Sequence, residues 1–187
     1  MNGLLNYLRK YGILLCNTNP ELPALEDIGC GWGDMTALLD RQQLFYCKVF
    51  RGRTTYLSRE AYYLLRAVRG ERRALTEEAA RVREVLVQTP GAETEFLKPL
   101  CGLDAKGFRE GFDFLLKNLY ATALENGTAI NPNWSTFRYA AAEVWEARVP
   151  NVYDCADSAG RLAALLGRTM PEKWVRAMMN YSNIQNC

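Results

Sequence analysis

An apolar stripe at helical spacing is the clearest pattern in the chain. It recurs at the intervals that one side of a helix requires and consists of Phe108, Phe112, Leu115, Leu116 and Leu119. Asp104 precedes the stripe as a candidate N-cap, and Leu103 is placed to pack on Phe108 as a hydrophobic staple. The spacing predicts one continuous helix over residues 105–119.

Two pairs of extended segments predict β-hairpins. Residues 44–50 and 53–57 are rich in β-branched and aromatic residues and flank Arg51-Gly52, where glycine favours the left-handed conformation of a tight turn. Residues 120–124 precede Asn126-Gly127, a dipeptide typical of hairpin turns, and a second extended stretch follows toward Tyr139. We therefore expect one hairpin to turn at Arg51-Gly52 and another at Asn126-Gly127.

Shorter helical patterns account for much of the remaining chain. Caps and apolar periodicity predict helices over 4–11, from Asp34, from Ser58 to Arg69, from Thr76 to Gln88, and over 94–101, 143–148 and 156–166. A last helix is predicted from Thr169, which forms a capping box with Glu172. With a short strand at 13–16, the predicted fold class is α+β and mainly helical.

The order of these elements predicts three parts. Residues 1–70 form a small N-terminal α/β unit with short helices and a β-hairpin, which ends near the charged stretch at 71–73. Residues 71–149 give three helices followed by a hairpin, which is the order of a winged helix. Residues 150–187 are expected to form C-terminal helices that pack back on the core.

Composition excludes several kinds of chemistry. The 187 residues include no histidine, so no Ser-His-Asp or Cys-His system and no histidine-ligated zinc is possible. The six cysteines are scattered without a CxxC pair, which predicts free thiols and no metal site. No cofactor motif is present, because the glycines at 29–33 lack the spacing of a phosphate-binding loop. Catalytic residues stay unknown at this stage.

The sequence pattern offers no candidate membrane span and no candidate signal peptide. No apolar run approaches the roughly 20 residues that span a bilayer, and the first ten residues do not resemble a signal peptide. We therefore expect a cytoplasmic protein with no membrane partner.

The net charge of +2 hides an uneven distribution. Residues 48–88 carry ten basic and five acidic groups. Within them, one side of the helix after Ser58 is predicted to carry Arg59, Tyr62, Tyr63, Arg66 and Arg69. Arginine alternating with tyrosine suits phosphate contact combined with base stacking, as in single-strand binders. The alternative is a solvated face whose tyrosines rest on the neighbouring hairpin.

The long helix after Asp104 is a second candidate surface. Its exposed basic residues, Lys106, Arg109 and Lys117, are candidates for nucleic-acid contact, although acidic residues balance them over 104–118. Gly107 and Gly111 lie one turn apart and predict close approach of another helix, strand or protein partner.

Two further groups have both a functional and a structural interpretation. The cysteines and the loop at Trp32 are candidates for lining a small-molecule pocket, although tryptophans more often serve as core residues. Asp154 and Asp157 have the spacing of an acid–base pair and equally that of a helix N-terminus.

Several segments resemble one family when taken in order. They are Tyr11–Cys16, Glu21–Leu25, Phe45–Ser58 and the three-helix block Leu75–Leu124. Together they are similar to the short AlkZ-related proteins, whose winged-helix part resembles that of the AlkZ/YcaQ DNA glycosylases. The glycosylases use a Gln-x-Gln motif, whereas this chain has only Gln42-Gln43 before the predicted winged helix.

The resemblance implies a winged-helix fold that contacts DNA or single-stranded nucleic acid. The leading hypothesis is therefore a nucleic-acid-binding protein without glycosylase activity. One alternative is an active base-excision glycosylase with displaced catalytic residues. Another is a protein-interaction or small-ligand-binding module, because one fold serves many functions.

Overall fold

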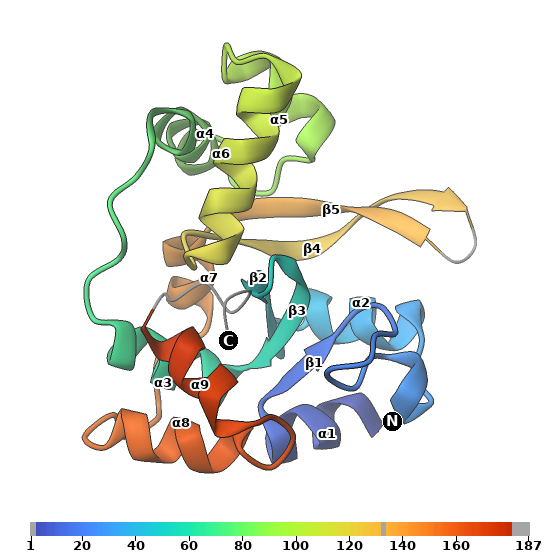
Figure 1. Ribbon diagram of the computed structural model, residues 1–187. Helices are drawn as coiled ribbons and strands as arrows, with labels where there is room; N and C mark the ends of the chain where they lie inside the picture. The colour runs from blue at the N-terminus through green and yellow to red at the C-terminus, as the bar shows by residue number, and fades with distance from the viewer. Residues whose placement is uncertain (1–2, 132–133, 181–187) are drawn as a thin grey trace.

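The computed structural model describes residues 3–131 and 134–180 and confirms an α+β, mainly helical fold. Over those residues it contains nine α-helices, one 3-10 helix and two antiparallel sheets. Figure 1 shows the arrangement: the hairpin β4–β5 crosses the middle of the molecule, with α4, α5 and α6 on one side and the three-stranded sheet and remaining helices largely on the other.

The N-terminal elements surround a three-stranded sheet with the strand order β1-β3-β2. In chain order they are α1 (Gly3–Tyr11), β1 (Ile13–Leu15), η1 (Glu26–Ile28), α2 (Trp32–Asp40), β2 (Leu44–Phe50), β3 (Arg53–Ser58) and α3 (Arg59–Arg69). Arg51 and Gly52 both have positive φ, at 50° and 68°. This confirms the first hairpin turn, since a two-residue turn with two left-handed residues matches the twist of its strands.

The three helices of the middle segment begin where the sequence predicted, two of them at their predicted caps. They are α4 (Glu77–Gln88), α5 (Thr94–Leu100) and α6 (Ala105–Lys117). The side chains of Thr76 and Asp104 accept hydrogen bonds from the first turns of α4 and α6. The helix α6 ends two residues earlier than predicted, because Leu119 adopts a left-handed conformation, with φ of 60°, that turns the chain into the next strand while its side chain stays buried.

The second hairpin is longer than expected, and its predicted turn at Asn126-Gly127 is wrong. Strands β4 (Ala121–Asn131) and β5 (Trp134–Ala141) pair beyond this dipeptide as far as Asn131 and Trp134. Asn126 pairs with Phe137, and the register shifts just after it. The Glu93 carboxylate accepts hydrogen bonds from Thr128 and Thr136 there, so a tertiary contact holds an irregular ladder where local sequence favoured a turn.

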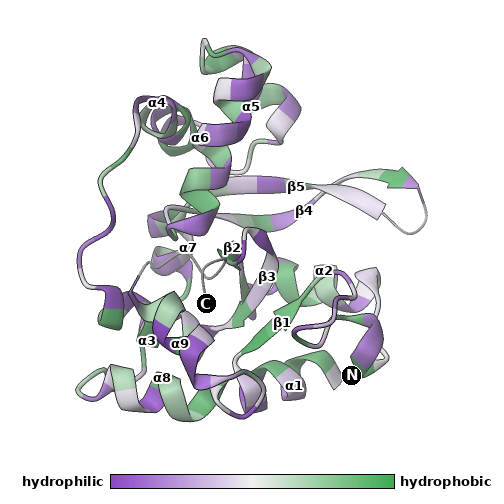
Figure 2. Cartoon of the chain, viewed as in Figure 1, coloured by the Kyte–Doolittle hydropathy of each residue, from purple (hydrophilic) through white to green (hydrophobic). Residues whose placement is uncertain are grey.

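The C-terminal helices pack mainly on α3 and on the hairpin β4–β5. They are α7 (Ala142–Arg148), α8 (Ser158–Leu166) and α9 (Glu172–Met179). The predicted capping box at Thr169 is wrong: α9 starts after Pro171, and Glu172 instead pairs with Arg176 along the helix. Figure 2 shows both apolar and polar residues along α8 and α9, and the buried ones include Leu162, Leu165 and Val175.

Two adjoining apolar cores hold the described segments together. One joins β2, α3, α7, α8 and α9 around Phe45, Tyr62 and Trp145, and the other joins α1, α2, α4, α6 and the hairpin. The first core contains residues from all three predicted parts, and the three-part division itself stays a prediction. In the described part of the chain, no helix has the length and apolar character needed to cross a membrane.

A close contact between α4 and α6 explains one of the two glycines singled out from the sequence. A methyl group on Gly111 would lie 2.7 Å from the Glu78 carbonyl carbon and oxygen, so α4 packs directly on the α6 backbone. The predicted close approach at Gly111 is confirmed, and the element that approaches is a helix of the same chain.

We expect Gly111→Ala to lower the free energy of unfolding by about 1–3 kcal/mol, because the methyl group would force α4 away from α6. The matched control is Gly33→Ala in α2, where a methyl group meets nothing within 4 Å. Alanine favours the helix there and should be neutral or stabilise by up to about 1 kcal/mol. Urea unfolding of both variants measures the difference, and equal effects would contradict the close packing.

Candidate nucleic-acid interface

The α3 helix is buried on more sides than its sequence indicated. Ser58 caps it by accepting a hydrogen bond from the Ala61 amide at 3.1 Å. The five residues from Ala61 to Leu65 are all buried. The helices α7 and α8 cover the side that a helical projection of α3 alone assigns to solvent. The helix therefore does not present a broad exposed face.

The two tyrosines of α3 are core residues, which corrects the prediction that they lie on an exposed side. Tyr62 is fully buried and stacks on Phe45 with ring centroids 3.9 Å apart, and its hydroxyl donates to Glu146 at 2.5 Å. Tyr63 is 9% exposed and donates to the Val149 carbonyl. Burial, with a contribution from Glu146, raises the pKa of Tyr63 to about 12. Neither ring is accessible for stacking on a base.

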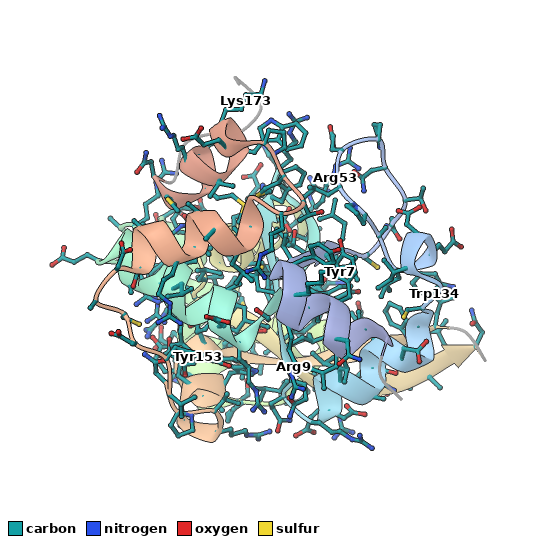
Figure 3. The ribbon with its side chains drawn as sticks, turned by 90° about the horizontal axis from the view of Figure 1, so that it is seen from below. Tyr7, Arg9, Arg53, Trp134, Tyr153 and Lys173 are labelled. Atoms are coloured by element: carbon teal, nitrogen blue, oxygen red, sulfur yellow. The ribbon has the colours of Figure 1, made fainter. Side chains whose placement is uncertain are left out.

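The arginines of α3 are half-buried and bind the chain's own carbonyl groups. Arg59 Nε donates to Gln42 O at 2.8 Å, and Arg69 Nε donates to Met178 O at 2.8 Å. An Arg66 amino group donates to Gly70 O at 3.0 Å. Arg59 also lines a cavity of about 270 Å³ that includes Arg9 and Tyr153 (Figure 3). Their contact with nucleic acid stays a prediction, and these bonds reduce the donors available for it.

Tertiary ion pairs neutralise much of the positive charge that the sequence concentrates in residues 48–88. Most of the acidic partners come from other parts of the chain. The pairs are Lys48–Asp113, Arg51–Glu21, Arg53–Glu21, Arg66–Glu146, Arg72–Glu143, Arg72–Glu146 and Arg83–Glu143. Six of the ten cations in this segment are therefore paired with carboxylates from outside it.

A network around Glu143 joins the 70–76 connection, α4 and α7. Arg72 and Arg83 bind the Glu143 carboxylate at 2.8 and 2.9 Å, and Arg72 also reaches Glu146 at 3.2 Å. Both guanidinium groups lie over the Tyr120 ring. Burial raises the pKa of Glu143, but its hydrogen bonds and the two arginine charges outweigh that effect and leave the pKa below its ordinary value.

The exposed side of α6 is the more open of the two predicted surfaces. Lys106, Arg109 and Lys117 are all exposed, and Lys106 lies 3.9 Å from Glu110. Gly107 is half-buried and its amide donates to the Asp104 cap at 2.6 Å. A partner protein at Gly107 and Gly111 stays untested, while α4 already occupies the space over Gly111.

The remaining polar candidates have structural partners. Asp157 accepts from Gly160 N as the cap of α8, and Asp154 accepts from Ala156 N, so both acids stabilise local backbone. Among the described cysteines, Cys16, Cys30, Cys47, Cys101 and Cys155 are free thiols. Within the same residues no cluster of acidic or cysteine side chains has the geometry to hold a metal ion.

The sequence did not reveal Glu21, Glu143 and Glu146 as partners of the central arginines. These acids lie far from the arginines in sequence, so no local charge pattern signals the pairs. The sequence also gave no spacing signal that Trp134 would contact Trp32, which it does at a ring centroid distance of 4.6 Å.

The fold and these surfaces define a small α+β protein. Its N-terminal α/β unit is followed by the three helices α4, α5 and α6 and then by the long hairpin β4–β5. The family model described as AlkZ related matches residues 1–176, and the chain belongs to that family. No curated protein and no solved structure gives a match to the chain.

We expect Glu143→Gln to lower the free energy of unfolding at pH 7 by about 1–2 kcal/mol, because two arginines lose a charged acceptor. The depressed pKa of Glu143 means that its stabilisation is present above the unfolded-state value, about pH 4.3, and is lost as pH falls through the folded-state pKa. The variant should therefore lose less stability than the wild type between pH 7 and 3.

Urea unfolding over that pH range measures both effects. The control is Glu77→Gln, which removes a carboxylate that is 77% exposed and paired with Arg81 within α4. An acid-induced loss as large in Glu143→Gln as in the wild type would show that the network is not linked to pH in this way.

Proposed function

We propose that this AlkZ-related chain is a nucleic-acid-binding winged-helix protein without glycosylase activity. One observation carries the proposal: α4, α5 and α6 are followed directly by the hairpin β4–β5, in the order of a winged helix. In that interpretation α6 is the recognition helix and the hairpin is the wing. Figure 1 supports it, since the outer part of the hairpin extends beyond the body of the molecule.

The exposed side of α6 is the surface we assign to nucleic acid. Lys106 and Lys117 lie near opposite ends of the helix, about 16 Å apart at 1.5 Å per residue. Arg109 lies between them, and all three side chains are exposed. Duplex affinity comes largely from neutralising phosphates, and three cations along one helix supply such contacts. The α3 arginines are less suited because carbonyl groups already bind them.

The acidic side chains support the absence of base excision. The chain lacks the Gln-x-Gln motif of the glycosylases it resembles, and it has no histidine. Among the described carboxylates, Asp154 and Asp157 bind local backbone, and Glu143 and Glu146 are held by arginines. A carboxylate with a lowered pKa and two fixed cations is suited to a structural ion pair more than to proton transfer.

We expect duplex binding whose log affinity falls linearly with log salt at about −0.9 per phosphate contact. Combined replacement of Lys106, Arg109 and Lys117 by alanine should reduce that slope by roughly 2.7. Fluorescence anisotropy at several salt concentrations measures it. Lys173→Ala is the control, because Lys173 is an exposed cation of α9 and not of α6 (Figure 3).

Arg59→Ala is measured in parallel, because the α3 arginines are the competing surface. A slope that falls more in Arg59→Ala than in the α6 variant would move the interface to α3. Affinity that does not depend on salt, or no binding at low salt, would overturn nucleic-acid binding altogether.

We also expect no abasic sites above the buffer control when the protein is incubated with duplexes carrying alkylated or crosslinked bases. Alkaline cleavage on denaturing gels measures the product, with a known glycosylase as the positive control. Abasic-site formation that disappears in Glu143→Gln or Glu146→Gln would instead establish a glycosylase with displaced catalytic groups.

A further inference from the structure

A cavity lies between the glycine-rich loop before α2 and the outer part of the β4–β5 hairpin. Its volume is about 810 Å³, within the range of small-molecule sites in proteins. Cys16, Cys30, Trp32 and Trp134 are among the residues that line it, together with Glu26. We call it the indole cavity. It involves none of the residues assigned above to nucleic acid.

The two tryptophans form a continuous aromatic wall. Their ring centroids are 4.6 Å apart at an angle of 48°, and Phe137 supports Trp32 from 5.1 Å. Trp32 Nε1 donates to Ser135 Oγ at 3.0 Å, and Ser135 in turn donates to Asn126. The Trp32 ring is therefore fixed in orientation, whereas Trp134 is 49% exposed.

The polar part of the cavity wall is negatively charged. Glu26 is the charged side chain of the described lining residues, and Thr18 donates to its carboxylate at 3.2 Å. Burial raises the pKa of Cys16, and burial with the nearby Asp34 charge raises that of Cys30, so both thiols are neutral at pH 7. The described lining contains no lysine or arginine, although the whole chain carries a net charge of +2.

We propose that the indole cavity binds a small organic cation whose charge lies on a flat aromatic ring. Indole is the best side chain for cation–π attraction, and a flat ring also stacks on it. The carboxylate favours positive charge, and the absence of basic residues from the described lining disfavours phosphate or carboxylate ligands. The inference goes beyond the proposed nucleic-acid function and does not depend on it.

The test uses the purified full chain without nucleic acid, and two probes that differ in one methyl group and one charge. The probes are 1-methylnicotinamide, a flat cation, and nicotinamide, its neutral counterpart. Calorimetric titration should show binding of the cation at least about tenfold tighter than that of the neutral probe. Choline serves as a third probe, and weaker binding than 1-methylnicotinamide would show that the flat ring contributes.

Two variants connect the binding to this cavity. Trp134→Ala should weaken cation binding by roughly 3- to 30-fold, as expected for loss of one cation–π partner. Glu26→Gln keeps an acceptor for Thr18 and should weaken the cation several-fold while leaving nicotinamide unchanged. Glu172→Gln, on the exposed side of α9, is the matched charge control and should change neither probe.

The thiols supply a second readout in the same molecule. Alkylation by N-ethylmaleimide, followed by peptide mass spectrometry, should be slowed at Cys30 by 1-methylnicotinamide. The half-buried Cys155 lies outside the cavity and should react at the same rate with or without the probe. Equal binding of the two nicotinamides, undiminished binding in Trp134→Ala, or no protection of Cys30 would each overturn the proposal.

Discussion

The hydroxyl of Thr122 connects the two sheets of this protein. It donates to Tyr46 O at 2.9 Å and accepts from Tyr46 N at 3.1 Å, and it is fully buried. β2 is an edge strand in the order β1-β3-β2, so its outer backbone groups need partners that the sheet itself does not supply. Because one threonine side chain satisfies both groups of Tyr46, the hairpin is fixed across the edge of the sheet. The same hairpin packs on α6 and α2, and its outer part lines the indole cavity.

The contrast between local and tertiary signals explains which predictions succeeded. The Ser58, Thr76 and Asp104 caps and the Arg51-Gly52 turn depend on neighbouring residues, and each lies where the sequence predicted it. The Asn126-Gly127 turn failed because Glu93 binds the strands there. A helical projection of α3 placed its tyrosines with the arginines, because it carried no information about α7 and α8, which cover the tyrosines.

The distribution of charged residues shows the same limit of local sequence signals for the candidate site. The excess of basic residues in 48–88 is real in sequence, and it suggested a nucleic-acid surface. In three dimensions Glu21, Glu143 and Glu146 lie against those arginines and neutralise them. Pairing between distant residues is set by the packing of helices, so a linear count of charges cannot reveal it. The exposed cations of α6 gave a weaker sequence signal but occupy the more accessible position.

The connection between α3 and α4 has the outward features of a cleavable linker. Residues 70–76 form no helix or strand and run along the outside of the molecule (Figure 1), where proteases usually cut and insertions are tolerated. Yet Tyr120 donates to Arg73 O at 2.7 Å, and the Arg72 side chain is held by Glu143 and Glu146. A protease can bind this segment only after the segment has detached from Tyr120, Glu143 and Glu146. The rate of nicking here would therefore measure how often the Arg72 ion pairs open, and the segment serves as a clamp between the two halves of the chain instead of a hinge.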